Sequence, residues 1–574
     1  MAGELTDSSF HRSTYLPQGA TSPTVRETQP YEMHAPTRSS PFWSLRKGVF
    51  VIRDIARRRL IAITLIGLVG FGGSAAFGLL VGISEPMFHD EFSYLLAADT
   101  FAHGRLTNPT HPMWIHFESF HIIHRPTYMS KYPPAQGLAL AIGQILGGHP
   151  IVGVWMSFGL MCAAICWMLY GWMTPRWAVL GGILALINPM LGIASYWAQS
   201  YWGGAVAASG GALLLGGVRR LMRRPHIRDA LLTGAGLAVL ANSRPYEGLL
   251  FSLPAGAFLL GWMLSKRGPS LAVSFQRIVM PISVVLILIG TAMGFYNFRV
   301  TGNALRLPYQ VHEETYAVAP VFIWQDLRPE PAYRHREIRD FHADYITLYF
   351  AQHSLSGFLE KNIGFIWESV KYYLNVFAIP LLALCPLIRW ALRNGWARRA
   401  LIVYAVLLPG LVLSTVTAVH YPAPLTGLNY FFVLSAMRLG RRRYQRAGQI
   451  MLWLLPCLAI AALAASVIYE TITKDSSSAW HLQRARFLVQ LDQDQSPHLI
   501  VVKYGPLHSV NDEWVYNEAE IDRAKAIWAR DMNAGQNCKL IEYFKDRRIW
   551  LLEVGMNEAL PKLKPYATDL CRRL

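Results

Sequence analysis

The chain has 574 residues, of which 53% are hydrophobic and only 16% charged. Soluble globular chains carry about 25% charged residues, so the composition excludes a cytosolic enzyme, a disordered scaffold and a small disulfide-stapled secreted domain. It favours a polytopic membrane protein. The net charge of +18 does not indicate nucleic-acid binding, because residues 470–574 hold as many acidic as basic residues and the excess lies beside apolar runs.

The amino-terminal segment precedes the first apolar run. Residues 1–40 are rich in Ser, Thr and Pro, which predicts a disordered cytoplasmic tail, and they show no cleavable signal peptide. Residues 60–83 are long and apolar enough to cross a bilayer. Basic residues just before this run resist translocation, so we expect the amino terminus to stay inside and the run to lead outward.

A transmembrane region is predicted over residues 41–468, with about eleven spans. Residues 84–134 and 296–372 interrupt it as two long external loops. Residues 204–211 space small residues four apart, which predicts close helix packing. After the first run, spans are expected in segments 151–173, 177–195, 203–217, 230–241, 249–264, 278–295, 375–387, 401–419, 425–436 and 448–468.

The last part of the chain, residues 469–574, is predicted to be a small external α/β domain, because an odd number of spans places it outside. Residues 498–504 and 548–554 are typical of strands, and residues 521–532 repeat apolar residues at helical spacing. Cys538 and Cys571 both fall in this part. We therefore hypothesise a disulfide between them in an oxidising compartment.

Two adjacent carboxylates, Asp90 and Glu91, follow the first run directly. A carboxylate at the end of a membrane span is energetically costly unless water or a hydrogen-bonding partner contacts it. One interpretation is an acid pair that stabilises the first turn of a helix over residues 92–101. The other makes Asp90 a general base and Glu91 a metal ligand or positioning group.

Cations that could bind phosphate are expected on the outer side of the membrane, the same side as Asp90 and Glu91. Lys131 stands in a Ser-Lys-Tyr-Pro-Pro turn, where it either binds phosphate or anchors the chain at the interface. Arg244 breaks the positive-inside trend and needs Glu247, another acid or a bound phosphate as its partner. Tyr132, Tyr246 and Glu247 adjoin these cations and are candidate substrate contacts.

Three further groups are open to more than one interpretation. Tyr196 and Trp197 are typical of an interfacial aromatic belt and secondly of a platform for a sugar. The first loop carries closely spaced nitrogen and oxygen ligands, so zinc is possible, with His89, Glu118 and His121 as candidates, although the spacing matches no specific signature. In the second loop either acceptor contacts or solvated surface are expected at Tyr309, His312, Glu313, Glu314 and Tyr316.

Together these motifs resemble the GT-C glycosyltransferases. Asp90-Glu91 after the first span, Lys131-Tyr132-Pro133-Pro134 at the end of the first loop and Ser243-Arg244-Pro245 between later spans carry the resemblance, over roughly residues 60–300. Within that group the pattern is similar to the dolichyl-phosphate-mannose protein mannosyltransferases and their bacterial relatives, which include lipid A aminoarabinose transferases. Some relatives have a second Asp where this chain has Glu91.

The resemblance implies transfer of a sugar from a polyprenyl-phosphate donor to a glycan, lipid or protein acceptor outside a bacterial-type inner membrane. Asp90 would deprotonate the acceptor with inversion at the anomeric carbon, and Lys131 and Arg244 would stabilise the departing phosphate. A divalent metal cofactor is possible and is not carried over. The alternatives are a multi-pass transporter or lipid flippase, although we see no internal repeat, and a non-enzymatic membrane protein with an external binding domain.

Overall fold

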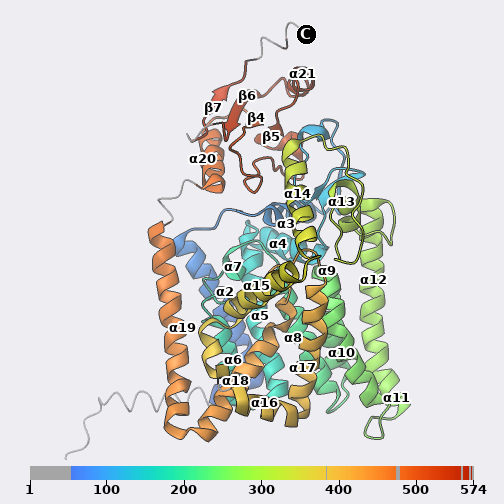
Figure 1. Ribbon diagram of the computed structural model, residues 1–574, viewed down its shortest axis with the longest axis vertical. Coiled ribbons are helices and arrows are strands. Elements are labelled where there is room, and N and C mark those ends of the chain that lie inside the picture. Colours follow the sequence, from blue (N-terminus) through green and yellow to red (C-terminus); the bar gives the residue numbers. More distant parts are fainter. Residues whose placement is uncertain (1–53, 383, 474–478, 557–559, 568–570, 572–574) are drawn as a thin grey trace, which may run out of the picture. The chain divides into compact units, whose positions relative to one another are not determined.

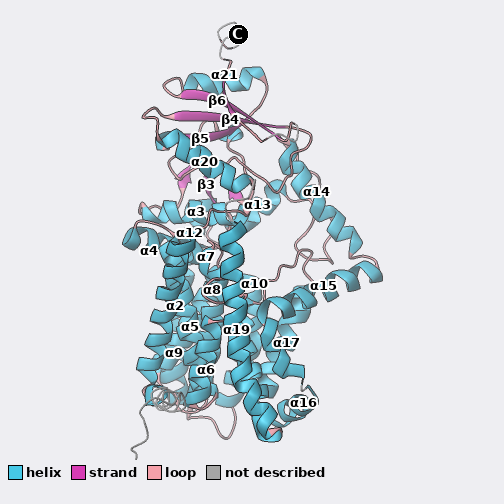
Figure 2. Ribbon diagram, turned by 90° about the vertical axis from the view of Figure 1, so that its left-hand side faces the viewer, coloured by secondary structure: helices cyan, strands magenta, loops and turns pink. Residues whose placement is uncertain are grey.

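The computed structural model describes residues 54–382, 384–473, 479–556, 560–567 and 571 (Figure 1). The tail predicted for residues 1–40 lies outside this part of the chain. Most of the described residues form helices, and two small sheets lie towards one end of the helical bundle (Figure 2).

A bundle of roughly parallel helices forms the body of the protein. Its members are α2 (Arg59–Val81), α5 (Ile151–Trp172), α6 (Pro175–Leu186), α8 (Gly204–Leu221), α9 (Ile227–Ser243), α10 (Pro245–Met263), α12 (Met280–Thr301), α17 (Gly395–Val412), α18 (Thr426–Arg443) and α19 (Gln445–Thr473). Short elements join them: α7 (Tyr196–Gln199), α11 (Leu271–Ser274), the π turn η2 (Phe275–Val279), η3 (Asn375–Leu382), α16 (Leu384–Arg393) and η4 (Ala423–Leu425).

The bundle confirms a helical membrane protein, although not the predicted number of spans. In the described part of the chain, five helical segments are long and apolar enough to cross a membrane: Arg59–Val81, Ile151–Trp172, Leu271–Thr301, Gly395–Val412 and Gly448–Tyr469. The bent pair Asn375–Leu381 and Pro386–Arg393 would make a sixth. The remaining bundle helices run beside them (Figure 1) but are shorter, or carry glycines and terminal arginines that lower their apolarity.

Small residues let these helices approach closely. The predicted packing segment lies in α8, where a Cβ atom on Gly211 would overlap the backbone of Pro424. Between α4 (Pro134–Gly147) and α5, a Cβ atom on Gly143 would likewise overlap the backbone of Gly153. Only glycine fits such contacts, which is why short helices can pack tightly here.

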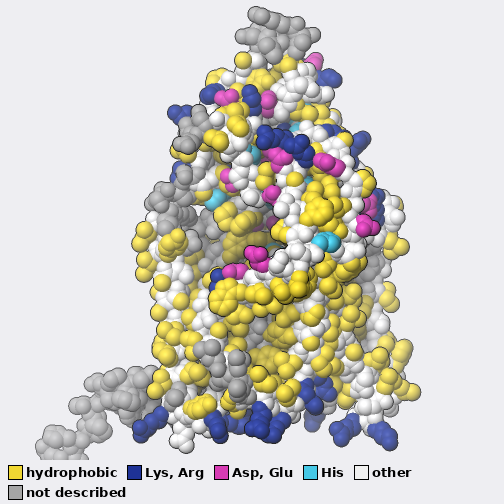
Figure 3. All heavy atoms as spheres, viewed as in Figure 1, with side chains coloured by type: hydrophobic (Ala, Val, Ile, Leu, Met, Phe, Trp, Pro, Cys, Tyr) yellow, Lys and Arg dark blue, Asp and Glu magenta, His cyan; other side chains and the backbone are white. Residues whose placement is uncertain are grey.

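The two ends of the bundle differ in charge. At one end, α8, α16 and α18 finish in Arg219, Arg220, Arg393 and Arg441 to Arg443, and Figure 3 shows Lys and Arg gathered along this margin. We call it the basic end. The opposite end carries the sheets and is called the sheet end (Figure 2).

The first loop region, residues 84–134, is a compact structure at the sheet end. Helix α3 (His89–Ala102) is followed by β1 (Asn108–Pro109), η1 (Trp114–His116), β2 (Ile122–Ile123) and β3 (Thr127–Ser130). The strands form an antiparallel sheet in the order β1-β3-β2, with Ile123 opposite Met129 and Asn108 opposite Tyr128.

The second loop region, predicted over residues 296–372, is largely helical. Helix α12 continues through Thr301, and three further helices follow: α13 (Pro308–Tyr316), α14 (Arg336–Ala351) and α15 (Leu355–Tyr373). The side chains of Phe120, Tyr316, Ile338 and Phe341 form a shared apolar cluster. This cluster packs the second loop region against the first.

The C-terminal part contains a four-stranded sheet. Strands β4 (His498–Tyr504) and β6 (Arg548–Val554) coincide with the predicted strands. The sheet order is β5-β4-β6-β7, with β5 (Ala526–Arg530) and β6 parallel to β4 and β7 (Leu563–Pro565) antiparallel to β6. Around it lie α20 (Trp480–Asp492), η6 (Ile521–Arg523) and α21 (Ala534–Tyr543).

One predicted element in this part is wrong, and one covalent prediction is confirmed. Residues 521–532 are not a helix, because Ile527 to Arg530 are buried on both faces and pair with β4 as strand β5. A short apolar run of this kind fits a buried strand as well as a helix. Cys538 and Cys571 form the hypothesised disulfide.

The C-terminal part is bonded directly to the first loop region. The Tyr128 hydroxyl donates to the Asn517 carbonyl at 3.0 Å, and the Ala519 N–H donates to Asp99 Oδ2 at 2.8 Å. Phe92 and Tyr516 stack with ring centroids 4.1 Å apart. These contacts fix the sheet over α3, which carries the candidate base.

Candidate functional site

The two adjacent carboxylates at the start of α3 have different surroundings. Glu91 is 1% exposed, and its Oε2 accepts the N–H groups of Met87 and Phe88 at 2.8 and 3.1 Å. Its Oε1 accepts the N–H of Tyr201 at 3.0 Å. Burial raises the pKa of Glu91, while these N–H donors act to lower it. Glu91 therefore caps α3 and ties it to the chain before α8, as the acid-pair interpretation expects.

Asp90 is only half-buried and keeps an accessible carboxylate. Its Oδ1 accepts a hydrogen bond from the hydroxyl of Tyr132. Tyr132 in turn stacks on Tyr94, one helical turn after Asp90, with ring centroids 4.7 Å apart. The carboxylate is thus oriented by a buried pair of tyrosines while one oxygen remains free of any hydrogen bond among the described residues.

Lys131 forms an ion pair with the second loop region. Its Nζ lies 3.3 Å from Glu313 Oε1, and both side chains are buried. The ammonium group also lies over the ring of Tyr309, 4.9 Å from its centroid. Burial alone would raise the pKa of Glu313, but the Lys131 charge and the hydrogen bond from His312 hold it well below its ordinary value. Lys131 is therefore held in place by a permanent countercharge.

Arg244 lies at the junction of α9 and α10 and, among the described residues, makes no close ion pair of this kind. No carboxylate in the described part of the chain lies within 4.0 Å of its guanidinium, which instead stands over the ring of Tyr421, 5.0 Å from the centroid. Glu247, its expected partner, is buried one turn further along α10 and makes no ion pair within that distance, although its charge acts to raise the pKa of Arg244. Arg244 is thus the cation of this site best able to receive a bound anion.

Electrostatics connect Arg244 with Asp90. Burial raises the pKa of Tyr94, the charge of Arg244 opposes that rise, and the charge of Asp90 adds to it. Tyr421, in the segment before η4, is affected in the same way by both charges. The charges of the carboxylate and the guanidinium therefore both act on Tyr94 and Tyr421 at the sheet end.

The remaining predicted substrate contacts serve the fold. Trp197 is 1% exposed and packs edge-on against Tyr372 and Tyr373, so it belongs to the core and not to an interfacial belt. The Tyr196 side chain interacts with Glu91. The Tyr246 hydroxyl donates to the Gly410 carbonyl at 2.8 Å and thereby joins α10 to α17.

Two of the three metal candidates are bonded elsewhere, whereas the buried His121 Nδ1 has no hydrogen-bond partner among the described residues. His89 Nε2 contacts the Asn511 carbonyl at 3.0 Å, and Glu118 receives the Tyr316 hydroxyl at 2.9 Å together with Arg334 and His335. Within the residues described, no three His, Cys, Asp or Glu side chains are grouped so that they could hold a metal ion together. The possible zinc set is thus not assembled in this arrangement.

Some site residues could have been found from the sequence and others could not. Tyr94 lies four residues after Asp90 in a predicted helix, so the two share a face. Tyr309 and Glu313, for which the sequence leaves acceptor contact or solvated surface open, both lie beside Lys131. Tyr421 follows a span and carries no local signal, because only the packing of the bundle brings it to Arg244.

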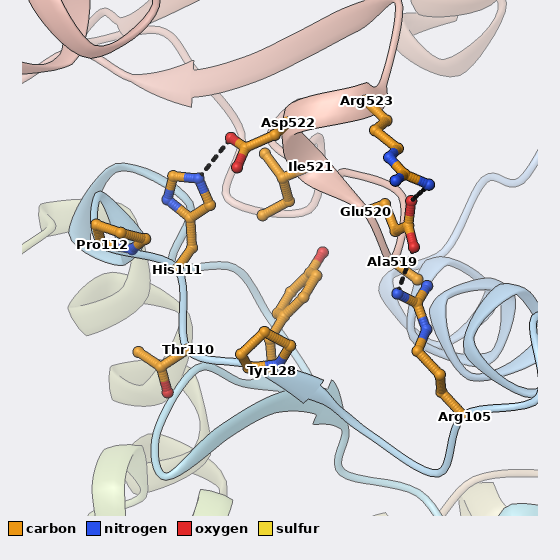
Figure 4. A pocket seen from close by; sticks show the side chains of 11 residues that line it. Arg105, Thr110, His111, Pro112, Tyr128, Ala519, Glu520, Ile521, Asp522 and Arg523 are labelled. Atoms are coloured by element: carbon orange, nitrogen blue, oxygen red, sulfur yellow. Dashed lines mark hydrogen bonds and ion pairs between the residues drawn. The ribbon is translucent and has the colours of Figure 1, made fainter.

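A separate cleft lies between the first loop region and the C-terminal part (Figure 4). It holds about 270 Å³ and excludes Asp90. Its charges are paired across the two parts: Arg105 Nη1 lies 2.6 Å from Glu520, and His111 Nε2 lies 2.9 Å from Asp522. Because Asp90 does not line it, this cleft is not the site of the carboxylate chemistry.

The described residues therefore define an integral membrane protein with a polar site at the sheet end of its helical bundle, beneath a small C-terminal sheet. No protein-family profile matches the chain, and no curated protein sequence does.

Several solved structures match most of the chain at low sequence identity. ArnT from Cupriavidus metallidurans in the apo state is 13% identical, with a TM-score of 0.49 and coverage of 89% of this chain and 93% of that one. The same protein bound to undecaprenyl phosphate is 14% identical, with a TM-score of 0.47 and coverage of 86% and 92%. The archaeal oligosaccharyltransferase AglB from Archaeoglobus fulgidus, in complex with an inhibitory peptide and a dolichol-phosphate, is 10% identical, with a TM-score of 0.42 and coverage of 85% and 69%. At these identities and scores, the reaction has to be argued from the residues of the site.

Proposed function

We propose that this protein transfers a sugar from a polyprenyl-phosphate donor to an acceptor at the outer face of the membrane. The observation that carries the proposal is a half-buried carboxylate, Asp90, bonded by Tyr132, and a guanidinium, Arg244, that has no carboxylate within ion-pair distance among the described residues; both charges act on Tyr94. A glycosyl transfer from phosphate needs both charges: one to take a proton and one to hold the leaving group.

In the proposed reaction Asp90 is the general base. It takes the proton of the acceptor hydroxyl as that oxygen bonds to the anomeric carbon, and the bond from this carbon to the phosphate oxygen breaks. Attack from the face opposite the leaving group inverts the configuration, by analogy with inverting glycosidases. The Tyr132 hydroxyl orients the carboxylate, and Glu91 acts as a positioning residue because its oxygens bind the backbone.

The leaving phosphate is assigned chiefly to Arg244. A half-buried cation with no carboxylate in direct contact has most to gain from a bound anion, since a charge without a close partner in a low dielectric is costly. Lys131 is already neutralised by Glu313, so it contributes to the phosphate site only if the phosphate shares or replaces that pairing. This order of importance reverses the one expected from the sequence.

The proposed orientation follows from the charges at the two ends. Arginines mark the basic end, and Lys and Arg resist translocation, so this end is placed in the cytoplasm of a bacterial-type cell. The sheet end, with Asp90 and the C-terminal part, then faces the periplasm. An external site suits an acceptor that is a glycan, a lipid or a protein, and nucleic acid has no place in this proposal.

The test is mass spectrometry of membrane lipids from cells that express the wild-type chain or Asp90→Asn at matched levels. Asp340→Asn is the control, because this carboxylate pairs only with Arg336 and Arg339 on the surface of α14. We expect a polyprenyl-phosphate sugar to accumulate in Asp90→Asn alone. Redistribution of another lipid or solute across the membrane, with no such accumulation, would favour a flippase or transporter instead.

A further inference from the structure

Helix α15 in the second loop region has three distinct faces. One face is apolar and exposed: at about 100° per residue, six side chains fall within an arc of roughly 120°. These are Leu355, Leu359, Ile363, Ile366, Trp367 and Val370, and Ile363 and Trp367 are 63% and 61% exposed. A continuous exposed apolar stripe on a helix calls for a partner.

The other two faces of α15 are already accounted for. Asn362, Phe365 and Tyr373 are buried, and Phe365 and Tyr373 join the main apolar core of the bundle. Glu360, Glu368 and Lys371 form a charged face, with Lys371 Nζ 2.7 Å from Glu368. The exposed stripe therefore lies between a face held by protein and a face suited to water.

The position of α15 in the fold places the stripe at the height of the spanning helices. Figures 1 and 2 both show α15 lying crosswise to α19, between the two ends of that helix and nearer the sheet end. In Figure 3 a row of apolar side chains follows α15 and merges with the apolar surface of the bundle beneath it, while acidic side chains lie towards the sheet end.

A polar contact anchors α15 to the end of a spanning helix. Lys361 Nζ donates to the Ser414 carbonyl at 2.5 Å, just after α17, and to Gln352 Oε1 at 2.7 Å. Both acceptors are neutral, so the contact fixes the height of α15 relative to α17 without an ion pair. The contact therefore holds α15 crosswise at the edge of the apolar surface formed by the spanning helices.

We propose that α15 is an interfacial helix whose exposed stripe lies among the acyl chains of the membrane leaflet at the sheet end. Lipid fits better than a protein partner because the stripe is continuous with the apolar belt of the spans and is bounded by charges on the side of the headgroups. An amphipathic helix with Trp, Leu and Ile on its apolar face is typical of this arrangement. The proposal does not depend on the transfer reaction.

The proposed position of α15 in the membrane leaflet also affects the candidate site around Asp90. Helix α14 leads directly into α15 and carries Phe341, whose ring packs 5.3 Å from His89, the neighbour of Asp90. Lipid contact at α15 would therefore fix the second loop region over the base. Part of the segment predicted from the sequence as an external loop then lies within the membrane.

Spin labels at three matched positions test the proposal. Ile287 in α12, Ile363 in α15 and Val489 in α20 are 67%, 63% and 65% exposed, and each is changed to Cys in a chain carrying Cys385→Ser and Cys457→Ser. The chain is reconstituted in phosphatidylethanolamine and phosphatidylglycerol vesicles. Collision rates are then measured with O₂, which concentrates in lipid, and with a water-soluble nickel chelate.

We expect the label at Ile363 to resemble that at Ile287, with an O₂-to-nickel collision ratio several-fold above that at Val489. A ratio at Ile363 equal to that at Val489 would overturn the proposal, because the stripe would face water. Protection from both reagents would also overturn it, since protein would then cover the stripe. Unchanged thermal unfolding of each labelled chain shows that the label has left the fold intact.

Discussion

Changing Asp90 or Glu91 to its amide should have different effects: the change at Glu91 should lower stability, and the change at Asp90 should lower the rate of transfer. In Glu91→Gln the new NH₂ group cannot accept a hydrogen bond, so the side chain loses the Tyr201 N–H or both the Met87 and Phe88 N–H groups. Hydrogen bonds to a charged acceptor contribute about 1.5–3 kcal/mol each. With the remaining bonds weakened by loss of charge, we expect the free energy of unfolding to fall by about 2–4 kcal/mol.

Asp90→Asn should leave stability unchanged and abolish transfer. Its Oδ1 can still accept the Tyr132 hydroxyl, while loss of a general base lowers the rate by about 10²- to 10⁴-fold. Thermal unfolding of the detergent-solubilised proteins, followed by intrinsic fluorescence beside a transfer assay on the same samples, separates the two effects. The reasoning is refuted if Glu91→Gln unfolds at the wild-type temperature or if Asp90→Asn unfolds as early as Glu91→Gln.

Three further predictions concern charge, acid and the disulfide. Arg244→Met should lower transfer by about 10²- to 10³-fold, and Arg244→Lys should restore part of it; equal rates for wild type and Arg244→Met in a purified assay would remove Arg244 from the phosphate site. Burial lowers the pKa of His124 and of His312 to about 4 from 6.5. Because the unfolded chain takes up these protons first, stability is lost as the pH falls below 6.5, by about 2 kcal/mol per histidine at pH 5. Unfolding temperatures measured from pH 7 to pH 5 should therefore fall in the wild type and fall less in a His124→Gln, His312→Gln double variant, and parallel profiles would contradict the prediction. Cys538→Ala opens a loop with a sequence separation of 33 residues, which should destabilise the C-terminal part by about 3–4 kcal/mol; protease resistance equal to that of wild type would argue against it.

The sequence was most informative where one segment carries its own pattern. Residues 498–504 and 548–554 are short apolar runs rich in Ile, Val, Leu and Trp, and both are strands with the predicted bounds. Residues 521–532 also repeat apolar residues at helical spacing, but pairing with β4 determines their conformation. Local preference is a weak guide when the sheet buries both faces of a segment.

In the candidate site, too, residues with a local sequence pattern were predictable and long-range contacts were not. Asp90 and Arg244 were found because a charge at the end of an apolar run is conspicuous in any sequence. The partners that distinguish their roles were not, since Glu313 reaches Lys131 from 182 residues away and Glu91 binds a backbone N–H 110 residues away. Hydrogen bonds to backbone groups cannot be predicted from residue types. The sequence alone therefore does not distinguish Glu91 from a catalytic acid.

The bond from His89 to the Asn511 carbonyl joins residues 422 positions apart in the chain. His89 belongs to the helix that follows α2, whereas Asn511 comes after all the helices of the bundle. The neighbour of the base therefore acquires its partner only after all the bundle helices have been synthesised. During insertion, all the bundle helices can be in the membrane before the C-terminal part completes the site. The protein should therefore become active only after the C-terminal part has folded. A chain stopped before β4 would occupy the membrane and remain inactive, which a transfer assay on such truncations would show directly.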